Sequence, residues 1–306
     1  MYKGFGAEAV AATVRHEDLL GRPVEIGNDY LPHNSWAEFD PVTMCRYQFD
    51  PWHTWRDERP GSAFVYGVPP LVEGFEGAFA RGVAGEFDAA YGRAARALVE
   101  SGHGDAIVRL GWEPNNRAIG PWQATDDPAG YAALFRHVVD VFRTTPGSCF
   151  TFDLSSSLGV QPGRRLHAFV DYYPEDGYVE WLGMNVYDLK WGDPTVSPDD
   201  RWSWIRSQES GLDAHVAFVR ARGNAMCAPS GVCTAAGTYS RAAETTRTAS
   251  IGWSSISPGA RSRPSRTSTT TGAAAHWRSS PRGGPLTWGG SGDHARANHA
   301  GLCRNS

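Results

Sequence analysis

Apolar residues in the first 223 positions form two kinds of pattern, short continuous runs and stripes with helical spacing. Continuous runs of about four to eight apolar or β-branched residues, bounded by turn formers, are typical of buried strands. Such runs predict five strands and a shorter candidate at the start of the chain, at 24–29, 63–68, 106–110, 149–152 and 181–187, with the candidate at 1–5.

Three stripes have spacings of three and four residues, the period of an amphipathic helix, and they cover 87–98, 131–142 and 212–219. Strands that alternate with helices are typical of parallel βαβ units. Since no Gly-rich phosphate turn follows any strand, the pattern favours a (β/α)8 barrel over a doubly wound sheet. Periodicity alone allows both architectures.

The composition changes near residue 223. Residues 224–306 contain nine Arg, no Lys and two acidic residues, a net charge of +7, whereas residues 1–223 carry a net charge of −11. Val, Ile, Leu and Phe together number five in this tail of 83 residues, too few to build strands or an amphipathic helix. We therefore expect one folded unit over 1–228 and a low-complexity, disordered tail over 229–306.

Several classes of protein are disfavoured by the same composition. No run approaches the roughly 18 apolar residues of a membrane span, and the chain does not open with the basic start and apolar run of a signal peptide. A net charge of −4 without a long basic run argues against a nucleic-acid partner. The spacing between Cys227 and Cys233 is wider than in zinc sites, and His33, His103 and His137 show no metal spacing, so we expect no metal.

Polar and aromatic residues gather where the predicted strands end. Because active sites of parallel α/β folds lie at the carboxyl ends of their strands, we expect these residues on one rim. They are Asp29, Tyr30, Trp112, Glu113, Asn115, Asp153, Tyr187, Asp188 and Trp191. Aromatic faces stack on sugar rings while carboxylates and amides bond hydroxyls, so the set predicts a carbohydrate site.

Glu113 is the candidate general acid/base, because it follows Trp112 directly at a strand end. The alternative is a solvated loop residue or an ion-pair partner of Arg109 or Arg117. For the three aspartates of the rim the alternative is loop capping, and for its tryptophans and Tyr187 it is ordinary packing. A retaining glycosidase also needs a second carboxylate, about 5 Å away, as its nucleophile.

Two segments carry a resemblance to a known family. Arg109–Asn115 (RLGWEPN) and Trp181–Asp188 (WLGMNVYD) resemble the fourth and sixth strands of glycoside hydrolase family 26, which contains β-mannanases, and Leu20–Val24 also looks similar. The similarity covers most of 1–223. It implies a (β/α)8 barrel that hydrolyses β-linked polysaccharide internally with retention, as a secreted monomer without a cofactor.

The resemblance also implies roles for single residues. Glu113 matches the acid/base, and Tyr187 matches the tyrosine beside the nucleophile. We expect sugar contacts from a set on the same rim, namely Trp112, Asn115, Tyr187, Trp191 and Asp29. Characterised mannanases carry His directly before the acid/base, where this chain has Trp112, so β-xylan and β-glucan stay open beside β-mannan.

The family's nucleophile glutamate lies in a Glu-Trp-Gly motif that this chain lacks. Codons allowed for residues 229–238 can be read in a second frame as Glu-Trp-Gly-Leu-Tyr-Ser-Gly-Gly-Asp. The same shift allows His-Val-Tyr-Tyr-Asp-Gly from 266–272 and Ala-Leu-Ala-Val from 275–279. We therefore hypothesise that a frameshift near 224–229 replaced the last quarter of the barrel; a genuine Arg-rich tail is the alternative.

An incomplete barrel would leave strand edges unpaired and apolar faces uncovered, so we expect an aggregation-prone chain with little or no hydrolysis. A non-catalytic carbohydrate-binding protein and the inert product of a damaged gene are the two other functions that the sequence leaves open.

Overall fold

The computed structural model describes residues 5–116, 118–158, 160–161, 164–165, 169–186, 196–228 and 232–234. Its centre is a seven-stranded sheet in the order β1-β2-β3-β4-β7-β8-β9. The first six of these strands run parallel, and β9 runs antiparallel to β8. The strands are β1 (Ile26–Tyr30), β2 (Ala63–Val68), β3 (Ile107–Leu110), β4 (Thr151–Ser157), β7 (Trp181–Asn185), β8 (Ala225–Ala228) and β9 (Val232–Thr234).

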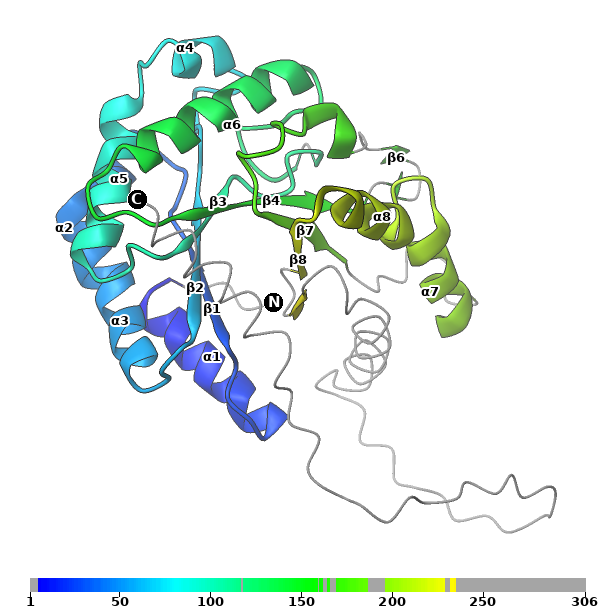
Figure 1. Cartoon of the computed structure of the whole chain (residues 1–306), viewed down its shortest axis with the longest axis horizontal. Helices are drawn as coiled ribbons and strands as arrows, with labels where there is room; N and C mark the ends of the chain where they lie inside the picture. The colour runs from blue at the N-terminus through cyan, green and yellow to red at the C-terminus, as the bar shows by residue number, and fades with distance from the viewer. Residues whose placement is uncertain are drawn as a thin grey trace.

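The six parallel strands curl into a half-barrel with helices on its convex side (Figure 1). The larger helices are α1 (Ala7–Leu20), α3 (Asp50–Asp57), α5 (Asp88–Glu100), α6 (Pro128–Arg143), α7 (Pro198–Ser207) and α8 (Leu212–Arg222). Shorter elements are η1 (Trp36–Phe39), α2 (Pro41–Thr43), η2 (Met44–Phe49), α4 (Phe79–Val83), η3 (Phe169–Tyr172) and the hairpin β5 (Val160–Gln161) and β6 (Arg164–Arg165). The three predicted helical stripes are confirmed in α5, α6 and α8.

Side chains alternate between the helix-covered face and the interior of the half-barrel, as the two-residue period of a strand requires. Near the amino ends of the strands, Val65, Ile107 and Trp181 form an apolar layer inside. Two residues further along β3 and β4 the interior becomes polar, because Arg109 and Asp153 lie opposite each other there in the sheet register. The interior therefore changes from apolar to polar toward the carboxyl ends, where the candidate site lies.

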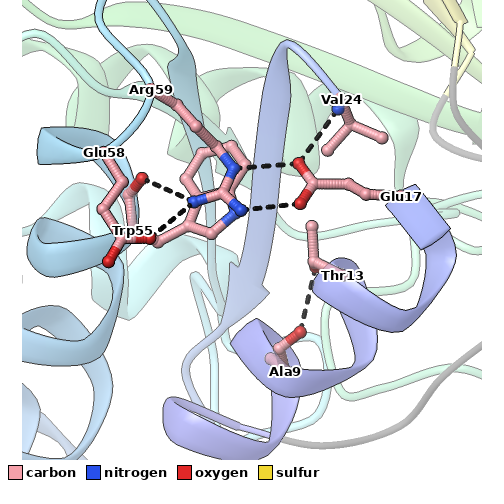
Figure 2. Close-up of polar contacts among 7 residues, drawn as sticks. All are labelled: Ala9, Thr13, Glu17, Val24, Trp55, Glu58 and Arg59. Carbon is pink, nitrogen blue, oxygen red and sulfur yellow. Dashed lines mark hydrogen bonds and ion pairs between the residues drawn. The ribbon is translucent and has the colours of Figure 1, made fainter. Parts of the chain in front are cut away.

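An ion pair fastens α1 to the segment that follows α3 (Figure 2). The carboxylate of Glu17 accepts hydrogen bonds from Arg59 at 2.9 and 2.7 Å and from the backbone N–H of Val24 at 3.0 Å. Burial opposes ionisation of this carboxyl, but the Arg59 bonds and charge outweigh it and lower the pKa of Glu17. The Arg59 guanidinium also lies over the Trp55 ring, 5.0 Å from its centroid. This cluster holds the first helix against the edge of the sheet.

The strand predictions need three corrections, because β4 was given wrong bounds and neither β8 nor β9 was predicted. The strand expected at 149–152 is wrong in its bounds, since β4 covers Thr151–Ser157 and Asp153 lies within it rather than after it. Apolar runs cannot reveal this extension, because polar side chains of β4 face a polar interior. The strand β9 lies inside the segment for which we expected disorder. The candidate strand at 1–5 and the tail from 235 onward lie outside the described residues, apart from Phe5, which is not in a strand.

None of the helices in the described ranges is long and apolar enough to cross a membrane.

Candidate active site

A tight turn after β3 places Glu113 at the carboxyl end of the half-barrel. Gly111 adopts a positive φ of 68°, and a Cβ atom there would lie 2.7 Å from the Trp122 ring, so glycine is required on both grounds. Glu113 itself has a φ of 49°, which is uncommon for a residue with a side chain. Its backbone N–H donates to the carbonyl of Ser155 at 2.8 Å, which ties the strained turn to β4.

Both oxygens of the Glu113 carboxylate accept hydrogen bonds from amide groups. Asn185 Nδ2 donates to Oε1 at 2.6 Å, and Asn116 Nδ2 donates to Oε2 at 2.9 Å. The two amide donors therefore fix the position of both carboxylate oxygens. Glu113 is 6% exposed, which excludes the solvated-loop alternative of the sequence analysis.

The ion-pair alternative for Glu113 also fails for Arg109. The Arg109 guanidinium bonds to Asp153 at 2.5 Å and to Asn28 at 3.2 Å, and both charged residues are almost fully buried. Burial opposes ionisation of Arg109, but the charge of Asp153 outweighs it and raises the pKa of the guanidinium. Asp153 also accepts a bond from Ser155 Oγ at 2.8 Å. Both bonds are made to Oδ2, whereas Oδ1 is buried without a hydrogen-bond partner among the described residues. Asp153 thus forms a structural pair with Arg109 through one of its two oxygens. Arg117 lies outside the described residues.

An aromatic cluster borders the turn that carries Glu113. The Trp112 ring packs edge-on against Tyr30, Trp122 and His33, with centroids 4.9, 4.5 and 5.9 Å away. Trp122 Nε1 donates to the carbonyl of Trp112 at 3.0 Å, which fixes the backbone beside Glu113. Trp122 is fully buried, whereas Trp112 is half-buried.

The structure brings Asn115 beside Glu113 but gives its amide a structural task. Its Nδ2 donates to the carbonyl of Ser157 at 2.9 Å, and its Oδ1 accepts from the N–H of Ser157 at the same distance. The side chain is 1% exposed. Asn115 thus joins the β3 turn to the end of β4.

Asp29 lies on the other face of its strand, toward the helices. Its carboxylate accepts bonds from Gly6 N at 2.7 Å, Trp52 Nε1 at 2.8 Å and Tyr30 N at 2.7 Å. Burial raises the pKa of Asp29 to about 6, and these three bonds limit the rise. The carboxylate connects β1 with α3 and the start of α1, whereas the Tyr30 ring next to it reaches the Trp112 cluster.

Three predicted rim residues, Tyr187, Asp188 and Trp191, lie outside the described residues. In the part of the chain that the structure does describe, no three His, Cys, Asp or Glu side chains gather as a metal centre requires.

Two residues that hold Glu113, namely Asn116 and Asn185, were not predicted from the sequence. Asn185 ends the strand β7, so its place at a carboxyl end was a signal that could have found it. Asn116 carries no such signal, because a polar residue in a turn has many ordinary roles.

Comparisons with known proteins give fold-level likenesses. No protein-family model matches the chain, and neither does any curated protein sequence. Among solved structures, GH26A from a Muricauda species shares 12% identity with a TM-score of 0.49, covering 73% of this chain and 74% of that one. The GH26 domain of an endo-β-mannanase/endo-β-glucanase from Prevotella bryantii shares 13% identity with a TM-score of 0.49, covering 74% and 73%.

A Cellulomonas fimi endo-β-1,4-mannanase double mutant shares 16% identity with a TM-score of 0.45, covering 67% of this chain and 48% of that one. Likenesses of this size do not assign the chain to a family or to a reaction.

Proposed function

We propose that this chain carries part of the active site of a retaining, endo-acting glycoside hydrolase of the family 26 type, with Glu113 as general acid/base. The observation that supports this most is the Glu113 carboxylate itself, buried at a strand end, held by Asn116 and Asn185 and bordered by the Trp112 cluster. The proposed substrate is a β-linked polysaccharide, with β-mannan first and β-xylan or β-glucan as alternatives.

In such a reaction the acid/base first protonates the glycosidic oxygen and later takes a proton from water. A residue with this task needs a fixed position and a change of protonation state in each cycle. The two amide donors and the tight turn fix the Glu113 carboxylate. The half-buried Trp112 ring offers a sugar an apolar face next to that carboxylate.

We further propose that the chain is inactive as written, because it lacks the partner of Glu113. Asp153, a second carboxylate inside the half-barrel, is engaged by Arg109 and Ser155 and is fully buried, so it is a poor nucleophile. The sequence has no Glu-Trp-Gly motif, and a frameshift near 224–229 remains our hypothesis for its loss. Loss of one member of a catalytic pair typically lowers the rate by several orders of magnitude.

A second candidate function is carbohydrate binding without turnover. The Trp112 ring favours it, because stacking on an aromatic face does not depend on the nucleophile. In both functions we propose Trp112, Tyr187 and Trp191 as sugar contacts, and Asn115 holds the turn that carries Trp112 and Glu113. We leave Asp29 out, because its carboxylate faces the helices and is bonded to Gly6 and Trp52.

The test is a pair of measurements on the purified 306-residue chain. Affinity electrophoresis on β-mannan, β-xylan and β-glucan reports binding, and the release of reducing ends reports hydrolysis. We expect retarded migration on at least one glycan, weakened in Trp112→Ala, with no reducing ends released. Hydrolysis by the chain would refute the proposed inactivity. A folded chain that binds none of the three glycans would refute both carbohydrate functions and favour an inert gene product.

A further inference from the structure

The side chain of Asn185 has one satisfied end and one unsatisfied end. Its Nδ2 donates to Glu113 Oε1 at 2.6 Å. Its Oδ1 is buried and has no hydrogen-bond partner among the described residues, although the residue is only 6% exposed. Most buried acceptors in native structures have a hydrogen-bond partner, so an unsatisfied one beside a candidate catalytic carboxylate calls for an explanation.

The position of Asn185 indicates the purpose. It is the last residue of β7, opposite Ser157 in the sheet register, at the carboxyl end where the Glu113 turn also lies. The amide therefore stands beside the carboxylate that would contact a bound sugar. An acceptor in that place matches a donor on the ligand, and a pyranose ring presents hydroxyl groups as donors.

From this geometry we infer that Asn185 contacts the ligand directly, with its Oδ1 accepting a hydrogen bond from one hydroxyl of the sugar bound against Glu113. The inference rests on the proposed function and deepens it, since it assigns a specificity-determining residue to the same site. One amide then has two tasks, because its nitrogen holds the Glu113 carboxylate and its oxygen selects a ligand hydroxyl. A ligand without that hydroxyl leaves the oxygen unsatisfied and binds less tightly.

Asn116 provides a matched control. Its Nδ2 also donates to Glu113, at 2.9 Å, but its Oδ1 already accepts a bond from the N–H of Ala118 at 3.2 Å. Replacement of either asparagine by leucine removes one donor from Glu113. Only the replacement of Asn185 also removes an acceptor that is available to a ligand.

The experiment is an NMR titration of the full-length chain with methyl β-mannobioside, β-xylobioside and β-cellobioside. Analogues of the disaccharide that binds are then titrated, each with one hydroxyl replaced by hydrogen. We expect one of these analogues to bind the wild-type chain about 3- to 10-fold more weakly than its parent, the loss of one hydrogen bond. In Asn185→Leu this difference should disappear, whereas in Asn116→Leu it should persist.

Asn185→Ala is measured in parallel, since leucine can disturb packing at the strand end, and thermal unfolding identifies any variant that fails to fold. The inference is overturned when both Asn185 variants fold, bind the parent disaccharide and still show the wild-type difference in affinity between parent and analogue. That result leaves the proposed function intact. A wild-type chain that binds none of the three disaccharides overturns the inference, whereas the proposed function is decided separately by affinity electrophoresis on the three glycans.

Discussion

Asp29 should make the stability of this protein fall as the pH rises from 4 to 7. Its carboxyl is 1% exposed, and burial raises its pKa from 3.8 to about 6. A group whose pKa is raised by folding binds its proton more tightly in the folded state, so its contribution is fully present below the unfolded pKa. That contribution is lost as the pH rises through the folded pKa. Two pKa units correspond to about 3 kcal/mol, of which about 2 kcal/mol falls between pH 4 and pH 7.

The assay is urea unfolding followed by tryptophan fluorescence, at several pH values, on the wild-type chain and on Asp29→Asn. The asparagine does not titrate, so the wild-type free energy of unfolding minus that of Asp29→Asn isolates the Asp29 contribution. We expect this difference to fall by about 2 kcal/mol between pH 4 and pH 7. An asparagine oxygen can still accept from Gly6 and Trp52, so the variant should fold.

Asp40→Asn is the control for the sign. Asp40 is exposed, and the hydrogen bonds from Thr43 lower its pKa, so its contribution should be lost as the pH falls rather than as it rises. The reasoning about Asp29 is refuted when the wild-type minus Asp29→Asn difference is flat between pH 4 and pH 7, or rises with pH as for Asp40.

Three further predictions concern stability, and Glu58→Gln is the control for the first of them. Glu17→Gln should lower the free energy of unfolding by about 1–3 kcal/mol, because it breaks a mostly buried ion pair with Arg59. Glu58→Gln removes an exposed partner of the same arginine and should change the free energy of unfolding by less than about 0.5 kcal/mol. Urea unfolding compares the two variants. Gly111→Ala should cost about 1–3 kcal/mol through its positive φ and its contact with the Trp122 ring, which thermal unfolding measures. Asp153→Asn should cost about 3–5 kcal/mol by leaving the Arg109 charge buried without its partner, and a neutral result in urea unfolding would show that the pair does not form.

Three of the larger helices, α5, α6 and α8, could be predicted from sequence because their apolar stripes face a single layer of core, whereas α1, α3 and α7 were not predicted. The stripe over 131–142, for example, matches the buried residues of α6. The strand β4 was predicted too short, since Ser155 and Ser157 belong to a polar interior that apolar runs do not mark. The strand β8 was not predicted at all, because it has only four residues and borders the Ser/Thr-rich tail.

The site shows the same division between local and tertiary information. Glu113 was identified from its position after a strand, which is a local property of the chain. Its hydrogen bond from Asn185 joins residues 72 positions apart, and only the sheet order β3-β4-β7 brings them together. Asp29 was also predicted to follow a strand, yet it lies within β1 and its side chain faces the helices. The two-residue period of a strand decides this, and an uncertainty of one residue in a strand end reverses it.

The central claim is that Glu113 is one half of a catalytic pair whose other half is missing from this chain. The most direct test measures the release of reducing ends from β-mannan, β-xylan and β-glucan by the product of the gene after its reading frame is corrected near codon 224. We predict hydrolysis of at least one glycan and a loss of about 100-fold or more in the Glu113→Gln variant. A folded, frame-corrected product that hydrolyses none of the three glycans, or a Glu113→Gln variant of it that is as active as the unsubstituted product, would contradict the account.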